Sequence, residues 1–266
     1  LKNTTITTLG MTVNGVYVSG ASDSIDINSS TFNVNAAVNN GFLIDNVSSQ
    51  NIDVYHNTFN VAFGGSMGSR STASNLLTWN NNTYTMSVIG AGGFIVSGGT
   101  NANISDNTLS SSVQQTGLGE LANAGVTGVN VHGNNFSSSF PFTVGFRVNG
   151  TTSTNNIFNN DFSIYQNTSQ AIDITGGSQN LDIYNNRIII AGDTSGGIDI
   201  DGSTSNTIRS NNFTIQGSLT PVYGINLGTG SASNTFRSND FNIITTSASN
   251  AGITLGGLGL GNQNSS

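Results

Sequence analysis

Charged residues are few in this chain, and three of them recur at one spacing. Arg147, Asp173 and Asp199 are separated by equal intervals, and Asp201 follows Asp199 on the same side of an extended segment. If successive repeats stack, neighbouring side chains lie ~4.8 Å apart, close enough for two carboxylates to share a cation or to perturb each other's pKa. Arg147, Asp173, Asp199 and Asp201 are therefore the candidate catalytic residues, and Asp173 with Asp199 is a candidate Ca²⁺ site.

Two alternatives stand beside this interpretation. Arg147, Asp173 and Asp199 also fit a structural role as an exposed ion pair with a spare carboxylate, worth ~0 to 1 kcal/mol. Asp26 and Asp53 form a second candidate Ca²⁺ site, because they fall on one outward row of adjacent repeats, where like charges cost stability unless a cation bridges them. Ca²⁺ is the one cofactor that the residues suggest, and no other is expected.

The elements that position these residues are repeats of roughly 26 residues. An asparagine returns once in each repeat at a near-constant interval, and a large apolar residue follows it two positions later, from Phe59 to Phe241. The asparagines are Asn57, Asn82, Asn107, Asn134, Asn160, Asn186, Asn211 and Asn239. Such a period, in a chain with two prolines and no long amphipathic helical pattern, predicts a solenoid with one coil per repeat.

Each repeat contains three segments of alternating polarity. Residues 51–63 alternate on both sides of Asn57, and a third apolar–polar–apolar segment, such as 172–174, closes most coils after a small residue. The predicted fold is all-β: a right-handed, single-stranded parallel β-helix of about ten three-strand coils, with residues 1–266 as one domain. The asparagines should form an internal ladder, with Ser30 in the equivalent place of an earlier coil.

Several local expectations follow from this register. The ladder asparagines should adopt the left-handed backbone of a sharp bend. Residues 64–74 should replace a clear third strand, and residues 110–124 should enlarge one coil. Trp79 falls on an inward position where its indole N–H needs a partner, through a bulge or a one-residue slip. A second, shorter internal ladder is expected at Asn155, Asn206 and Asn234. The exposed aromatic residues are expected to be too scattered for a groove: Tyr17, Tyr55, Phe158 and Tyr184.

Composition excludes several classes of partner. The net charge is −7, from 13 acidic and six basic residues, whereas a nucleic acid partner needs clustered Lys and Arg. No apolar run approaches the ~18 residues of a membrane helix, so membrane insertion is not expected. The chain has no cysteine, is rich in Asn, Ser, Thr and Gly, and opens at Leu1. We interpret it as a module of a longer exported protein, extracellular or at a bacterial cell surface.

The segment Ser-Asn-Thr-Ile-Arg-Ser-Asn-Asn-Phe at 205–213 is echoed by Ser-Asn-Thr-Phe-Arg-Ser-Asn-Asp-Phe at 233–241. This motif resembles the right-handed parallel β-helix repeat of the pectin-lyase-like superfamily, and the resemblance covers nearly the whole chain. The superfamily includes lyases, hydrolases, epimerases, phage tailspikes and adhesins, so the resemblance implies a fold and not one function. Enzymes resembling pectate lyases hold Ca²⁺ with carboxylates and abstract a proton with arginine, while polygalacturonases use three aspartates. Neither pattern maps cleanly onto this chain.

The scarcity of catalytic residue types favours a non-catalytic structural or adhesive module that binds a glycan or a protein through its bend loops. A polysaccharide or a surface glycoprotein is the expected partner. The alternative is a polysaccharide-active enzyme of the lyase or epimerase type, with its carboxylate and arginine site on the third sheet. Ice binding by a flat threonine array is disfavoured, because the outward third-strand positions vary among Arg, Asp, Asn and Thr. Open solenoid ends expose strand edges, so end-to-end or trimeric self-association is a further expectation.

Overall fold

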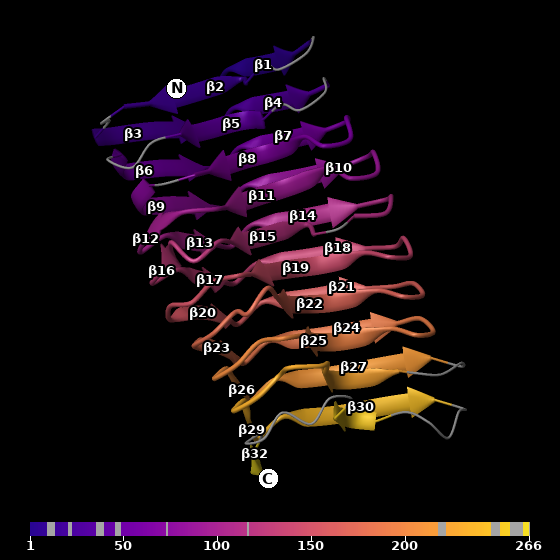
Figure 1. Ribbon diagram of the computed structural model, residues 1–266. Coiled ribbons are helices and arrows are strands. Elements are labelled where there is room, and N and C mark those ends of the chain that lie inside the picture. The colour runs from indigo at the N-terminus through magenta and orange to yellow at the C-terminus, as the bar shows by residue number, and fades with distance from the viewer. Residues whose placement is uncertain are drawn as a thin grey trace.

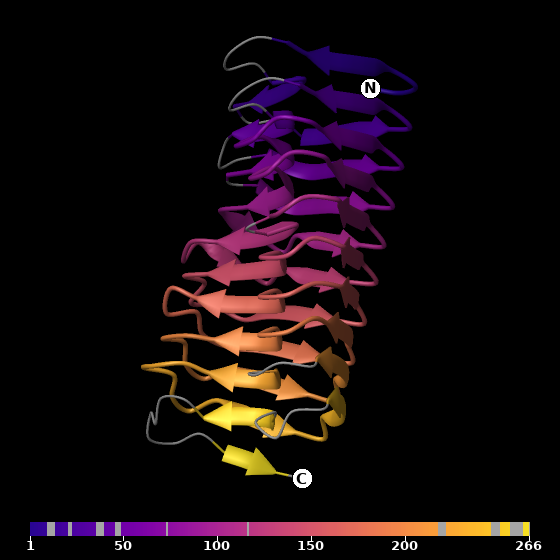
Figure 2. The ribbon, with the colours of Figure 1, turned by 90° about the vertical axis from the view of Figure 1, so that its right-hand side faces the viewer.

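The computed structural model describes residues 1–9, 14–20, 23–35, 40–45, 49–72, 74–115, 117–217, 222–245, 251–255 and 263–265. Every regular element in this part of the chain is a strand, and the strands form three parallel sheets wound as a solenoid (Figure 1). Figure 2 shows the coils stacked along one axis from the N-terminal to the C-terminal end. The predicted all-β parallel solenoid is confirmed.

We name the three sheets A, B and C. Sheet B follows the turn that carries the repeated asparagine, and its strands are, in spatial order, β1 (Thr5–Thr8), β4 (Thr31–Val34), β7 (Thr58–Val61), β10 (Thr83–Met86), β14 (Thr108–Ser111), β18 (Asn135–Ser138), β21 (Asp161–Ile164), β24 (Arg187–Ala191), β27 (Asn212–Gly217) and β30 (Asp240–Thr245). Sheet C follows sheet B within each coil, and its strands are β2 (Val16–Ser19), β5 (Asn40–Asp45), β8 (Met67–Ser71), β11 (Gly92–Val96), β15 (Gly119–Ala122), β19 (Val144–Asn149), β22 (Gln170–Thr175), β25 (Gly196–Ile200), β28 (Tyr223–Leu227) and β31 (Ala251–Leu255).

Sheet A precedes the asparagine turn. Its strands are β3 (Asp23–Asn28), β6 (Ser49–Tyr55), β9 (Ser74–Asn80), β13 (Asn103–Ser105), β17 (Asn130–His132), β20 (Asn155–Phe158), β23 (Leu181–Tyr184), β26 (Thr207–Arg209), β29 (Thr235–Arg237) and β32 (Gln263–Ser265). The two-residue strand β12 (Gly99–Thr100) pairs with the start of β9, and the two-residue strand β16 (Val126–Thr127) pairs with β12. Within the described residues, sheets B and C each contain ten strands, and eight of the turns carry the repeated asparagine. The number of complete asparagine turns is therefore slightly lower than the ten coils predicted.

The core is narrow and built from stacked identical positions. Parallel pairing sets Phe32, Phe59 and Tyr84 directly over one another, with ring centroids 4.7 Å apart in both pairs and all three side chains buried. Glycine near the start of the sheet C strands makes room for these rings. A Cβ on Gly41 would lie 2.6 Å from the carbonyl oxygen of Gly68 and 2.9 Å from the Phe59 ring. The predicted small residue before each third strand thus has a steric reason.

The asparagine ladder is continuous from Asn57 to Asn239. At each step the Oδ1 atom accepts the backbone N–H and the Nδ2 of the asparagine one coil earlier, at 2.9–3.1 Å. The Nδ2 atom of each ladder asparagine also donates to a backbone carbonyl of the preceding coil, as from Asn82 to Val54 at 2.8 Å. Ser30 begins the row by donating its N–H to Asn57 Oδ1 at 3.0 Å. The predicted ladder is confirmed, and its buried amides are fully paired.

The left-handed backbone lies one residue earlier than predicted. His56, Asn81 and Asp106 have φ of 55°, 52° and 56°, whereas the asparagines that follow them do not have positive φ. The ladder asparagine must aim its amide along the solenoid axis, so the residue before it makes the bend. That preceding residue is polar or glycine at the ladder turns, which suits the left-handed region.

The expectation that residues 64–74 replace a third strand was wrong, because β8 (Met67–Ser71) lies within them and pairs with β5 and β11. Ser69 stands in register with Phe42 and Phe94, and its Oγ lies 2.8 Å from the phenol oxygen of Tyr84. The small serine leaves space for the phenol. Because a polar residue here takes the place of a large apolar one, the hydrophobic pattern of the sequence did not indicate this strand. The next irregular stretch, 110–124, holds β15; residues 73 and 116 lie outside the described residues.

Trp79 keeps the register, in line with Val54 before it and Ile104 after it. Its side chain is fully buried, and its Nε1 has no hydrogen-bond partner. The expected partner for the indole N–H is therefore absent, and the ring instead packs 5.7 Å from the centroid of Phe94. An orphaned donor of this kind costs about 1–3 kcal/mol, which the burial of the large ring offsets.

The second internal ladder is present for two of its three predicted members. Asn206 donates its backbone N–H to Asn234 Oδ1 at 3.0 Å, and Asn206 Oδ1 in turn accepts the N–H of Leu181 at 3.0 Å. Asn155 lies apart from this pair, because Leu181 occupies the coil between them. It makes the same kind of bond alone, accepting the N–H of Val129 at 3.0 Å.

Candidate functional site

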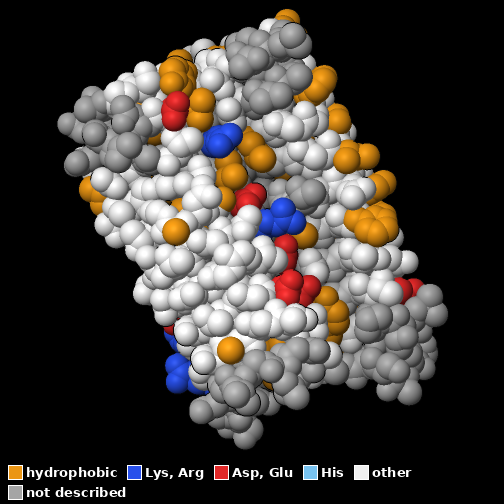
Figure 3. Space-filling model, viewed as in Figure 1, with side chains coloured by type: hydrophobic (Ala, Val, Ile, Leu, Met, Phe, Trp, Pro, Cys, Tyr) orange, Lys and Arg blue, Asp and Glu red, His pale blue; other side chains and the backbone are white. Residues whose placement is uncertain are grey.

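The predicted row of charged residues lies on the outward face of sheet C. Parallel register places Arg147, Asp173 and Asp199 on β19, β22 and β25, directly beside one another. Glu120 on β15 precedes Arg147 in the same row. Figure 3 shows blue and red side chains gathered along the middle of this face of the molecule. The sequence therefore predicted three members of the row, and the structure adds Glu120 and, two coils before it, Arg70 on β8.

Each aspartate of the row is engaged by a neighbour. Asp173 Oδ2 accepts from Arg147 Nε at 3.2 Å, with the two side chains 12% and 28% exposed. Asp199 Oδ2 accepts from Gln170 Nε2 at 2.7 Å, and its Oδ1 accepts from Asn226 Nδ2 at 2.8 Å. Asp199 is consequently not the spare carboxylate of the structural interpretation, because amide donors from both adjacent strands hold it.

Desolvation dominates the electrostatics of this row. Burial raises the pKa of Asp173, although the neighbouring Arg147 guanidinium acts in the opposite direction. Burial also raises the pKa of Asp199 and of Glu120, each above the ordinary carboxyl value. Raised carboxyl pKa values occur at catalytic acids, but half-buried ion-pair networks produce them equally well.

The sequence analysis did not identify three residues of this neighbourhood: Glu120, Gln170 and Tyr223. The Tyr223 ring lies over Gly196, where an added Cβ would come within 2.0 Å of it. Burial, followed by the charge of Asp199, raises the Tyr223 pKa to about 12. The signal for Glu120 was its position one repeat length before Arg147.

Asp201 lies just beyond the end of β25 and is exposed. It adds to the negative field at Asp173 and Asp199, where its charge raises both pKa values. The four catalytic candidates are thus brought into one neighbourhood, but Arg147, Asp173 and Asp199 are engaged by partners and Asp201 lies at the rim. None of these four described residues is a carboxylate that is both unpaired and buried.

The described residues contain no group of three or more His, Cys, Asp or Glu side chains arranged to hold a metal ion. Asp26 and Asp53 do lie in register on β3 and β6. Asp26 accepts a hydrogen bond from the Tyr55 hydroxyl at 3.0 Å and another from Asn28 Nδ2. Ca²⁺ at either aspartate pair stays a prediction, with two carboxylates per site as the available charged ligands.

The expectation that exposed aromatic residues are scattered was wrong for sheet A. His132, Phe158 and Tyr184 stack in register, with ring centroids 4.9 Å apart at each step, and Arg209 places its guanidinium carbon 4.0 Å from the Tyr184 centroid. Arg209 also pairs with Asp182 at 3.0 and 2.7 Å. Neighbours cover the faces of Phe158 and Tyr184, so this ridge offers ring edges and not a platform for stacking a sugar.

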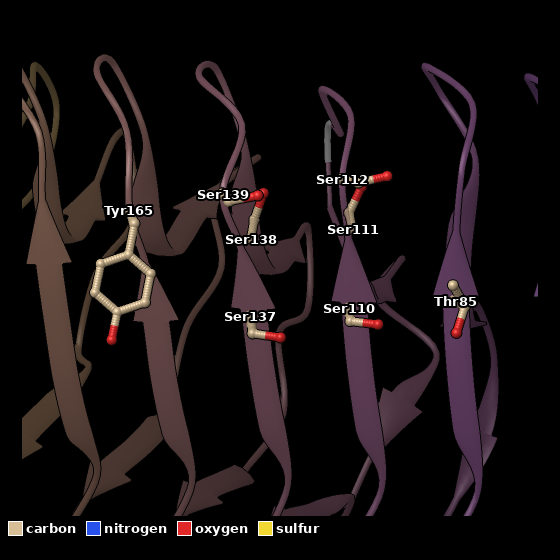
Figure 4. Close-up of a pocket in the computed structure, with 8 residues that line it drawn as sticks. All are labelled: Thr85, Ser110, Ser111, Ser112, Ser137, Ser138, Ser139 and Tyr165. Carbon is tan, nitrogen blue, oxygen red and sulfur yellow. The ribbon is translucent and has the colours of Figure 1, made fainter.

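Two surface hollows formed by described residues lie away from the sheet C carboxylates. One, of about 310 Å³, lies on sheet B and is lined by Thr85, Ser110, Ser111, Ser112, Ser137, Ser138, Ser139 and Tyr165 (Figure 4). Another lies on sheet A and is lined by Asp53, Tyr55, His56, Thr78, Asn80 and Asn81. Neither hollow contains a residue of the candidate catalytic row.

The described part of the chain includes no helix of the length and apolarity that crossing a membrane would require. Comparisons of the chain with protein-family models, with curated proteins and with solved structures each found no match.

Proposed function

We propose that this chain is a non-catalytic structural or adhesive module, extracellular or at a bacterial cell surface, that binds a polysaccharide or a surface glycoprotein through its bends. The observation that carries the proposal is a line of exposed apolar side chains at the bends between sheets B and C. Its members are Phe63 (43% exposed), Val88 (37%), Ile89 (60%), Phe140 (38%) and Phe142 (54%). Figure 3 shows hydrophobic side chains along the right-hand edge, where these bends lie in Figure 1.

Exposed apolar groups that gather on one edge are uncommon on monomeric proteins and mark interaction sites. The phenylalanines at these bends are partly exposed, so part of each ring is accessible to a sugar ring or to a partner's side chain. The rigid coils behind them hold the bends at the regular spacing of the solenoid, which suits an extended ligand. The paired state of the sheet C aspartates supports a binding role over a catalytic one.

Membership of the pectin-lyase-like superfamily is part of the same proposal. Its support is the parallel solenoid with an internal asparagine ladder, together with the repeated motif that ends at Phe213 and Phe241. Because that fold carries both enzymes and adhesins, membership would not decide between them.

A polysaccharide-active enzyme of the lyase or epimerase type is the second candidate. The specific observation in its favour is the raised carboxyl pKa of Glu120, Asp173 and Asp199 beside Arg147. Its test is thermal unfolding with and without millimolar Ca²⁺, on the wild type and on Asp173→Ala/Asp199→Ala. A Ca²⁺-dependent rise of the midpoint in the wild type alone would support a cation site and justify assays on uronate polysaccharides.

The adhesive proposal is tested by binding to a glycan array and to immobilised surface glycoproteins. Phe140→Ser/Phe142→Asn should reduce the binding at least tenfold, because both exposed rings leave the edge. Leu76→Asn is the matched control: Leu76 is 47% exposed and, like Phe142, has a positive φ (55° and 58°), but it lies on sheet A. Equal binding by the wild type and both variants would contradict a role for this edge.

A further inference from the structure

The outward face of sheet B carries a row of five threonines in consecutive coils. Thr5, Thr31, Thr58, Thr83 and Thr108 are paired in parallel register on β1, β4, β7, β10 and β14. Adjacent members are therefore ~4.8 Å apart, and the row is roughly 19 Å long. The threonine array that the third strands lacked is present on a different sheet.

A second polar row runs parallel to the first, two residues further along each strand and hence ~6.6 Å away. Its members are Thr7, Asn33, Asn60, Thr85, Ser110, Ser137 and Ser163. We call the ten residues of the first five coils in these two rows, from Thr5 to Ser110, the threonine face. The threonine face contains no charged side chain. Further along the solenoid the first row carries Asp161 on β21, Arg187 on β24 and Asp240 on β30.

The hydroxyl groups of the first row are available to a ligand. The structure gives no hydrogen bond from the side-chain oxygens of Thr5, Thr31, Thr58, Thr83 and Thr108 to the rest of the described protein. Threonine is branched at Cβ, so few χ1 rotamers are open to it, and each strand is anchored by a core residue between the two rows, such as Phe59. Hydroxyls and methyls are thus held at regular positions before any ligand arrives.

The surface beside the second row is hollowed and hydroxyl-lined. Figure 4 shows Thr85, Ser110 and Ser137 at the same level of successive strands, with the Tyr165 ring beside the next coil, where Tyr165 directly follows β21. The hydroxyls of Ser110, Ser111, Ser137 and Ser138 donate within the protein, so they present acceptors to ordered water.

These features together describe the chemistry of the ligand. It must be uncharged, since the face carries no charge, and it must repeat every ~4.8 Å along the solenoid axis, since the first-row hydroxyls do. The second row adds hydroxyls at Thr7, Thr85 and Ser110 and amides at Asn33 and Asn60. It must also be rigid, because weak contacts add up across a surface only when both partners hold the same spacing. We propose that the threonine face binds ice, whose lattice of water oxygens is uncharged, rigid and periodic on this scale.

A crystalline polysaccharide is the other uncharged periodic surface, and the face fits it less well. Sugar rings are bound by aromatic faces, and neither row of the threonine face contains an aromatic side chain. The exposed phenylalanines lie at the bends, beside the threonine face and not within it. The inference goes beyond the adhesive role of the bends and uses different residues.

The test compares ice binding by the wild type with Thr58→Tyr/Thr83→Tyr. Tyrosine keeps a high strand propensity, but its ring stands above the plane of the threonine face and breaks contact along the middle of the row. The matched control is Thr207→Tyr/Thr235→Tyr, which makes the same change at two adjacent outward positions of sheet A. Circular dichroism confirms that all three proteins keep the β spectrum.

The readouts are partition of labelled protein into a slowly growing ice shell and the shape of single ice crystals. The wild type and the sheet A control should enter the ice and facet the crystals, and Thr58→Tyr/Thr83→Tyr should lose at least about tenfold in partition. Exclusion of the wild type from ice would overturn the proposal, as would full retention by Thr58→Tyr/Thr83→Tyr. Binding of the wild type to crystalline chitin or cellulose without ice binding would also overturn it, in favour of a polysaccharide. Phe140→Ser/Phe142→Asn should bind ice as the wild type does. This variant therefore distinguishes a failure of the adhesive proposal from a failure of the ice-binding proposal.

Discussion

Replacing Asn134 with alanine is the sharpest test of how the solenoid is held together. Asn134 Oδ1 accepts both the N–H and the Nδ2 of Asn107 at 2.9 Å, and its Nδ2 donates to Ile104, His132 and Asn160 at 2.9–3.0 Å. In the Asn134→Ala variant, the backbone N–H of Asn107 and one hydrogen on the Nδ2 of Asn107 are left buried without an acceptor. Each orphaned donor costs about 1–3 kcal/mol, so Asn134→Ala should lower the free energy of unfolding by about 4 kcal/mol.

The measurement is urea unfolding followed by circular dichroism on the wild type, Asn134→Ala and Asn135→Ala. Asn135 is the adjacent residue, exposed on β18, and its loss should change the free energy by less than about 0.5 kcal/mol. Because each coil contacts only its neighbours, a break in the middle should also reduce the m-value or split the transition, as the two halves unfold separately. A loss below about 1 kcal/mol for Asn134→Ala would refute the claim that the ladder carries this energy.

Three further predictions concern single side chains. Burial raises the folded-state pKa of Asp199 above its ordinary 3.8, so the ionised carboxylate destabilises the fold above the raised pKa and this cost disappears as the pH falls toward 3.8. Asp199→Asn should therefore raise the urea midpoint at pH 7 and leave it unchanged at pH 3. A lower midpoint at pH 7 would mean that the hydrogen bonds of Asp199 outweigh its desolvation. Arg209→Ala should lower the free energy of unfolding by about 1–2 kcal/mol, because it removes a two-point ion pair with Asp182 and a cation–π contact with Tyr184. Arg187→Ala should lower it by about 0.5 kcal/mol or less, because the side chains of its ion pair with Asp161 are 57% and 40% exposed. Equal losses in urea unfolding would contradict this ranking. Trp79→Phe should change the free energy of unfolding by no more than about 1 kcal/mol, because removal of the unpaired indole N–H offsets the lost volume. A loss above about 3 kcal/mol would show that packing dominates. The fluorescence of this single tryptophan in the wild type should be blue-shifted and should not be quenched by iodide.

The sequence allowed the solenoid and its ladder to be predicted because both depend on one-dimensional regularities. Period-two alternation sets which side chains face inward, and the recurring asparagine sets the register between coils. Predictions failed where a side chain from another coil fills a core position that the local sequence leaves small or polar. Ser69 sits at an inward position in place of a large apolar residue because the Tyr84 phenol fills its space, and Trp79 is buried without a hydrogen-bond partner.

Outward rows were harder to predict than the core. No hydrophobic signal marks them, and because the repeat length varies from coil to coil, a row shifts out of line unless every bend is counted correctly. The threonine face and the stack of His132, Phe158 and Tyr184 were missed for this reason. Arg147, Asp173 and Asp199 were found because their spacing is uniform, but their neighbour Gln170 gave no sequence signal.

The asparagine ladder also gives the solenoid a direction. Every Oδ1 from Asn82 onward accepts from the coil before it, and none accepts from the coil after it, so the amide dipoles point the same way along the axis. The two directions along the ladder therefore differ: each Oδ1 faces the preceding coil, and each backbone N–H faces the following coil. A further coil, from this or any other chain, can continue the ladder only head to tail. Growth by that route produces a polar fibre, whereas a two-fold dimer of like ends would set donor against donor and acceptor against acceptor.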